Sequence, residues 1–68
     1  MTDERKQEVT SNLMSVYDTF EPVKEDFIFK PSMFWLISNY NQKYDNPELI
    51  GGDWVIKNCP SPLKDLQP

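Results

Sequence analysis

The sequence predicts an α+β fold, in which two main amphipathic helices pack with a small two-stranded sheet; a mostly α fold is the alternative. Apolar residues recur at helical spacing in residues 9–20, and the densest cluster of large apolar side chains lies in residues 33–44. Two short apolar segments, residues 27–30 and 54–57, have the length of strands. One short extra helical turn and a proline-rich tail complete the expected fold.

The chain is long enough for one small domain, which we expect to span residues 1–59. With 68 residues, it buries only about 60% of the surface that its unfolded chain exposes, so its stability is expected to be marginal. Residues 1–8 contain no core residue and are expected to fray. Residues 60–68 hold three prolines and form the C-terminal tail. The nine aromatic residues are ample for a compact core and argue against a disordered chain.

The first predicted helix runs from about Asp3 to Phe20. Thr2 or Asp3 caps its start, and Pro22 ends it because the residue before a proline is driven out of the helical region. The apolar residues fall at the i, i+4, i+7, i+8 and i+11 positions of one helix face. These residues are Val9, Leu13, Val16, Tyr17 and Phe20.

The central helix is predicted from Met33 to about Tyr44, with Ser32 as its N-cap. It follows a short strand at Phe27–Lys30, in which alternate side chains point to opposite sides. At about 100° per residue, one face of this helix is expected to pack against the first helix, with Phe34 and Leu36 flanking that face. The predicted core residues of this face are Met33, Ile37, Tyr40 and Tyr44.

Three further elements are predicted after the central helix. Asn46 caps a helical turn at Pro47–Ile50, which Gly51 and Gly52 terminate. Trp54–Lys57 then resembles the earlier strand in length and in its terminal lysine, so the two strands are expected to pair. The tail is expected to hold one helical turn at Pro62–Leu66 or no regular structure.

Composition excludes several kinds of site. The single cysteine, Cys59, cannot form an intramolecular disulfide, and with no histidine in the chain it cannot complete a zinc site. Neither a dinucleotide-binding nor a phosphate-binding glycine motif is present. No histidine is available as an acid, a base or an activator of Cys59. We therefore expect no enzymatic activity, no cofactor and no bound metal.

The net charge of −4 is unevenly distributed. Residues 1–29 hold seven acids and three bases, whereas the remainder holds four of each. This acidity disfavours direct nucleic-acid binding, which needs cations to displace counterions, and is compatible with a partner protein that has a basic surface. The polar N-terminal residues predict no signal peptide, and the longest apolar run, Met33–Ile37, is far shorter than a membrane span. We expect a soluble, cytoplasmic protein.

Trp35 is the most informative candidate for partner binding. Helical geometry places it opposite the predicted core face, among polar residues. Such a tryptophan is either covered by another part of its own chain or anchors a partner, since tryptophan is enriched at interface hot spots.

The other candidates are an acidic cluster and a methionine. The acids form either a docking patch or a solvated segment, and Met14, at the edge of the first helix's apolar face, is either core filler or a contact residue. The candidate partner-binding residues are Trp35, Asp18, Glu21, Glu25, Asp26 and Met14.

These observations favour a small acidic, non-catalytic protein-binding factor that regulates or inhibits a larger cytoplasmic protein or enzyme complex. Phage-encoded inhibitors of host enzymes are one class of viral protein with this character. A homo-oligomeric structural or accessory subunit is the alternative, in which Trp35 meets its own copies. Nucleic-acid mimicry ranks lower, because −4 over 68 residues is a modest charge.

Overall fold

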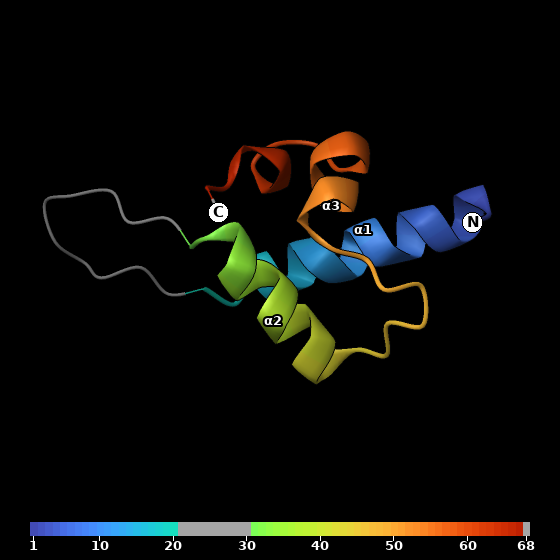
Figure 1. Ribbon diagram of the computed structural model, residues 1–68, viewed down its shortest axis with the longest axis horizontal. Helices are drawn as coiled ribbons and strands as arrows, with labels where there is room; N and C mark the ends of the chain where they lie inside the picture. Colours follow the sequence, from blue (N-terminus) through green and yellow to red (C-terminus); the bar gives the residue numbers. More distant parts are fainter. Residues whose placement is uncertain (21–30, 68) are drawn as a thin grey trace, which may run out of the picture.

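The protein is helical in the residues that its computed structural model describes, 1–20 and 31–67. The elements are α1 (Asp3–Asp18), α2 (Met33–Lys43), α3 (Gly52–Asn58) and a 3₁₀ turn, η1 (Leu63–Asp65). Figure 1 shows α2 crossing α1, with α3 and the C-terminal turn on the other side of the view. Helix α1 contacts all three other elements, so it is the helix around which the core is assembled.

The predicted α+β fold is wrong, because the described residues contain three helices and a 3₁₀ turn and no strand. The mostly α alternative fits the structure. The predicted strand at Trp54–Lys57 lies within α3, and its intended partner, residues 27–30, lies outside the described residues.

Helical geometry in α3 places apolar residues that are four positions apart on the same, buried side. Val55 and Cys59, four residues apart, are both buried. The Val55 amide donates to the Gly51 carbonyl oxygen at 3.2 Å, and the Cys59 amide donates to the Val55 carbonyl oxygen at 2.9 Å. A four-residue apolar segment fits a strand or a helical turn equally well, and only the position of Cys59 beneath Val55 distinguishes the two.

Helix α1 begins and ends at side-chain caps. The Thr2 hydroxyl accepts a hydrogen bond from the Arg5 amide at 3.1 Å, and the Thr19 hydroxyl donates to the Val16 carbonyl oxygen at 2.6 Å. The helix therefore ends at Asp18, two residues before the predicted end at Phe20. Its fully buried residues, Val9, Leu13 and Val16, belong to the predicted face.

Helix α2 begins as predicted, but its buried face is rotated. The Ser32 hydroxyl accepts from the Trp35 amide at 3.0 Å. Leu36, expected to flank the core, is fully buried, whereas Ile37 and Tyr44 are only half-buried. The prediction used α1 as the sole neighbour of this helix, while the core cluster also includes residues of α3 and η1.

Residues 44–51 connect α2 to α3 and are called the link. The predicted helix at Pro47–Ile50 is absent; Pro47 and Glu48 form a turn instead. The Asn46 side chain closes this turn, because its Oδ1 accepts from the Ile50 amide at 3.1 Å and its Nδ2 donates to the Ile50 carbonyl oxygen at 3.2 Å. Gly51 is the N-cap of α3, so it precedes a helix and does not terminate one.

The proline-rich tail contributes to the core. Its predicted helical turn is present as the shorter η1, and Leu63 and Leu66 are buried with the residues of α1, α2 and α3. The Gln67 carbonyl oxygen accepts a hydrogen bond from the Met33 amide at the start of α2. The tail therefore packs between elements that precede it in the chain.

Candidate partner-binding surface

Trp35 is partly covered by its own chain. Its side chain is half-buried and packs against the core cluster. The indole meets the Phe20 ring edge to face, with ring centroids 5.2 Å apart and planes at 75°. This geometry is one that aromatic pairs prefer, so Phe20 accounts for part of the contact area that Trp35 would offer to a partner.

Met14 and Asp18 line one shallow groove along α1. The groove has a volume of about 720 Å³, and Asn58 of α3 forms its other wall. Trp35 does not line it. The other three predicted acids, Glu21, Glu25 and Asp26, lie outside the described residues.

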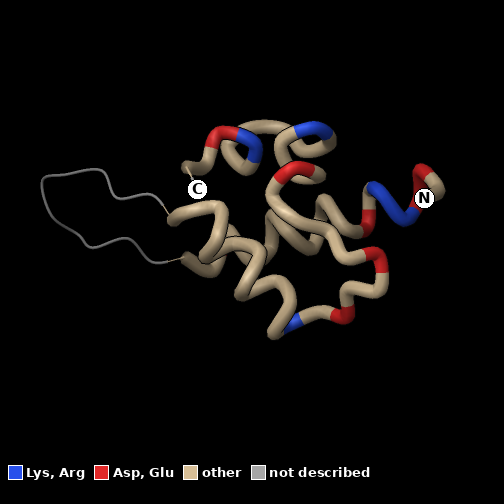
Figure 2. Tube along the Cα trace, in the orientation of Figure 1, with Lys and Arg blue, Asp and Glu red and all other residues tan. Residues whose placement is uncertain are grey.

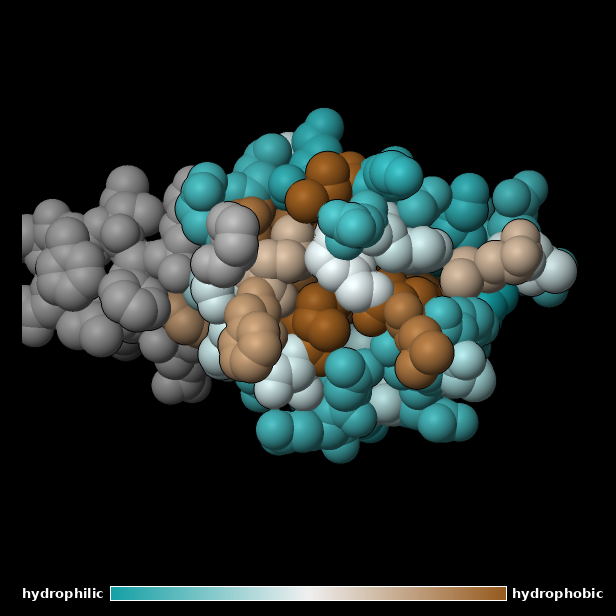
Figure 3. Space-filling view, in the orientation of Figure 1, coloured by the Kyte–Doolittle hydropathy of each residue, from teal (hydrophilic) through white to brown (hydrophobic). Residues whose placement is uncertain are grey.

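Large apolar side chains are exposed outside α1. Phe34 on α2 is 79% exposed, Leu49 in the link 87%, and Ile56 on α3 54%. Figure 3 shows hydrophobic surface on the face that carries α2 and α3. Helix α2 adds no charge to this surface before Lys43 at its end, as Figure 2 shows.

Leu49 combines this exposure with an unusual backbone conformation. Its φ of 56° places it in the left-handed region, where no other described non-glycine residue lies. This region costs an L-residue with a bulky side chain on the order of 1 kcal/mol. The Leu49 amide donates to the Asn46 carbonyl oxygen at 3.2 Å, and this bond closes the turn.

A hollow of about 440 Å³ lies beside Leu49, at the C-terminal end of α2. We call it the Leu49 hollow. Its walls combine apolar groups, two amides and one carboxylate. The lining residues are Asn41, Tyr44, Asp45, Asn46, Leu49 and Ile50.

Among the polar groups of this hollow, the Asn46 amide is engaged in hydrogen bonds within the chain, whereas the Asp45 carboxylate has no ion-pair partner among the described residues. The Asn46 Nδ2 donates to Asn41 Oδ1 at 2.9 Å as well as to the Ile50 carbonyl oxygen, so both of its hydrogens are engaged. Asp45 makes no ion pair with any described residue. The Tyr44 ring stacks on the buried Tyr40 ring, with centroids 5.5 Å apart, which fixes one wall.

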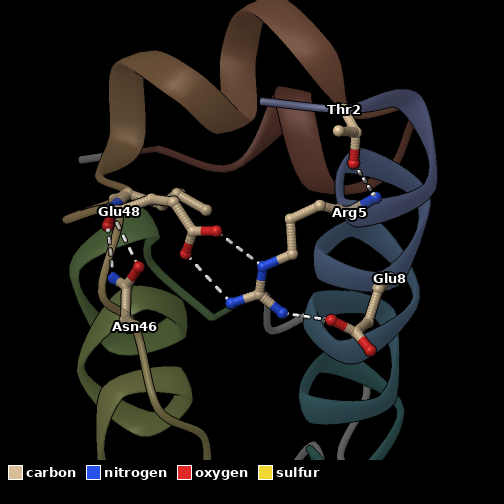
Figure 4. A network of polar contacts seen from close by, with 6 residues as sticks. Thr2, Arg5, Glu8, Asn46 and Glu48 are labelled. Atoms are coloured by element: carbon tan, nitrogen blue, oxygen red, sulfur yellow. Dashed lines mark hydrogen bonds and ion pairs between the residues drawn. The ribbon is translucent and has the colours of Figure 1, made fainter.

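An ion-pair clamp holds the link against α1 (Figure 4). Arg5 Nε donates to Glu48 Oε2 at 2.6 Å and its second terminal nitrogen donates to Glu48 Oε1 at 2.9 Å. The same guanidinium binds Glu8. The hydrogen bonds from Arg5 lower the pKa of Glu48, and those to Glu48 and Glu8 raise the pKa of Arg5. The clamp and the Asn46 bonds together fix the residues on either side of Leu49.

Chemically reactive groups are sparse in the part of the chain that the structure describes. It contains no group of three or more residues able to hold a metal ion. Burial raises the pKa of Cys59 and outweighs the opposing hydrogen bond with the Thr10 hydroxyl, 3.8 Å from the sulfur, so the thiol keeps its proton at neutral pH. None of the described helices is both long and apolar enough to span a membrane.

Leu49, Asp45 and Tyr44 were not among the predicted binding residues. Leu49 was placed in a helical turn, where its backbone would be ordinary. A leucine gives no sequence signal for a left-handed conformation, because glycine and asparagine are the residues typical of it. Asn46 and Pro47 were predicted as the cap and first residue of that helical turn, whereas they belong to the turn between α2 and α3 that carries Leu49.

Comparison with known proteins gives no relative: no protein-family model, curated protein or solved structure matches this chain.

Proposed function

We propose that this chain is a small non-catalytic protein-binding factor that regulates or inhibits a larger protein of the cytoplasm, and that it binds through the surface around Leu49. The observation that carries the proposal is the exposure of Leu49, 87%, in a left-handed backbone conformation.

Folding gains little from a leucine at position 49. Because the side chain is exposed, it contributes little hydrophobic burial. Glycine or asparagine would adopt its φ at lower cost, and the Asn46 bonds and the Arg5–Glu48 clamp hold the flanking backbone. A residue that costs folding free energy without packing is typical of a functional surface. Contact with another protein would explain the leucine.

Two further features support a protein partner. Phe34 and Ile56 expose large apolar side chains on α2 and α3, and burial of such side chains against a partner is favourable. The net charge of −4 is compatible with a basic surface on the partner.

The test is a binding comparison of Leu49→Asn with the unchanged chain. Each tagged protein is used to capture partners from the cytoplasm of its source, and the captured protein, once identified by mass spectrometry, is titrated by calorimetry. We expect Leu49→Asn to weaken binding at least tenfold, which corresponds to about 1.4 kcal/mol. We also expect its free energy of unfolding to stay equal or to rise by about 1 kcal/mol, because asparagine tolerates the backbone conformation.

Leu49→Met is the matched control. It keeps a large apolar side chain and the same backbone cost, so binding should stay within about threefold of the unchanged chain. Equal capture by Leu49→Asn, or no captured protein at all, would reject the proposal. In the second case, a dimer in sedimentation at high concentration would favour the homo-oligomeric alternative.

A further inference from the structure

The Leu49 hollow has the volume, lining and charge to receive a long basic side chain. Building on the proposed function, we propose that it seats an arginine side chain of the partner protein, with its stem against Leu49 and its guanidinium between Asp45 and Tyr44.

Asp45 is the only charged residue that lines the hollow among the described residues. It has no ion-pair partner there. In contrast, Glu48, three residues later, is already paired with Arg5. The link therefore carries one satisfied carboxylate outside the hollow and one unpaired carboxylate in its wall. An unpaired carboxylate beside an apolar wall attracts a cation from a binding partner.

The end of α2 adds to this attraction. The last carbonyl groups of a helix have no partner within the helix and carry partial negative charge. Helix α2 ends at Lys43, and the hollow begins at its last turns with Asn41 and Tyr44. Lys43 does not neutralise this end from within the hollow, because it lines a different depression, together with Val16 of α1.

The walls favour arginine over lysine. A guanidinium is planar and stacks on aromatic faces, and its fork of donors matches a carboxylate. The Tyr44 ring, held in place by its stack on Tyr40, provides the face, and Asp45 provides the acceptor. The Asn46 amide nitrogen is engaged twice within the link, so it offers no competing donor. Leu49 is left as the apolar surface for the methylene stem.

The test uses a small probe and needs no partner. The full chain, labelled with ¹⁵N, is titrated with N-acetyl-arginine amide and separately with N-acetyl-citrulline amide, which has nearly the same shape and no charge. We expect the arginine probe to shift the backbone amide signals of Asn41, Tyr44, Asp45 and Leu49 in a saturable way, with a dissociation constant on the order of 1–10 mM. The citrulline probe should leave them unshifted.

Asp45→Asn should weaken the arginine probe at least tenfold, and the matched control Asp53→Asn, an acid in the first turn of α3 outside the hollow, should not. Equal shifts with both probes, unchanged affinity in Asp45→Asn, or shifts centred on the acids of α1 would overturn the inference. Because the probe binds the chain alone, its failure would leave Leu49-dependent capture of a partner intact. Conversely, a bound probe without any Leu49-dependent partner would reject the proposed function.

Discussion

Tyr40 buries a hydroxyl group that has no hydrogen-bond partner among residues 1–20 and 31–67. Its side chain is fully buried in the core, and no described residue makes a hydrogen bond to the hydroxyl oxygen. Burial raises the pKa of this phenol above its ordinary value. A buried hydroxyl without a partner loses its hydrogen bonds to water and gains none in return. The Tyr40 hydroxyl is thus expected to destabilise the folded protein.

Replacing Tyr40 by phenylalanine should stabilise the protein. The Tyr40→Phe change keeps the ring and its stack on Tyr44 and removes the unpaired oxygen, so we expect the free energy of unfolding to rise by about 1 kcal/mol. Urea denaturation followed by tryptophan fluorescence measures it. Tyr44→Phe is the control, since that ring is only half-buried, and should change stability by less than about 0.5 kcal/mol. A loss of stability in Tyr40→Phe would mean that the hydroxyl is paired.

At the scale of single residues, caps could be predicted and Leu49 could not. Ser32 was predicted as a cap, and Thr2 was one of the two residues predicted for the start of α1, from short-range patterns that depend only on neighbouring amides. Leu49 is flanked by residues that the Asn46 side chain and the Arg5 guanidinium hold in place, and Arg5 is forty-three residues before its partner Glu48. Local sequence patterns cannot predict the ion pair between Arg5 and Glu48, because it joins residues far apart in the chain.

At the scale of elements, the start of α2 depends on a single hydroxyl. Because Ser32 satisfies the Trp35 amide, Ser32→Ala should lower the free energy of unfolding by about 1 kcal/mol. Thermal unfolding followed by circular dichroism measures the change. Ser38→Ala, within the same helix, removes a hydroxyl that caps nothing and should be neutral or slightly stabilising. Equal losses in both variants would contradict a capping role.

The tail should matter to stability as much as a helix does. Leu63 is fully buried although it lies in a three-residue turn. Leu63→Ala should therefore cost about 2–5 kcal/mol, the range for a buried leucine. The neighbouring Lys64→Ala is exposed and should cost less than about 0.5 kcal/mol. Chemical denaturation of both variants measures these losses in the free energy of unfolding. If the tail were only loosely attached, the loss would be small in both variants.

Long elements could be predicted from their period, and short ones could not. Helices α1 and α2 span enough residues for the 3.6-residue period to show. Helix α3 has seven residues and buries only Val55, with Cys59 buried at its C-cap, so its apolar segment also fitted a strand. The rotated face of α2 was missed for a different reason: α2 also packs against α3, whose position the sequence pattern did not provide.

For the whole molecule, the Arg5–Glu48 clamp predicts that acid destabilises the fold. The pKa of Glu48 is lower in the folded protein than its ordinary value of 4.5. Its contribution to stability is therefore present above that value and is lost as the pH falls through the folded pKa. We expect the urea concentration at the midpoint of unfolding to be lower at about pH 3 than at neutral pH. The difference should be smaller in Glu48→Gln.

Glu8→Gln is the matched control for that measurement, because it removes the other carboxylate that binds Arg5 and leaves the link attached. It should keep more of the pH dependence than Glu48→Gln does. An identical pH profile in Glu48→Gln and the unchanged chain would show that the clamp does not contribute. Raised salt should weaken the clamp as well, since both partners lie near the surface.

The Met33 amide donates a hydrogen bond to the Gln67 carbonyl oxygen, so exchange of this amide proton reports whether the tail is attached to α2. This amide belongs to the first turn of α2, where no carbonyl of the helix itself can accept it. In hydrogen exchange, its protection therefore measures how often the tail leaves α2, separately from unfolding of the helix. The exchange rate of this single amide would then give the free energy for local detachment of the tail from the start of α2.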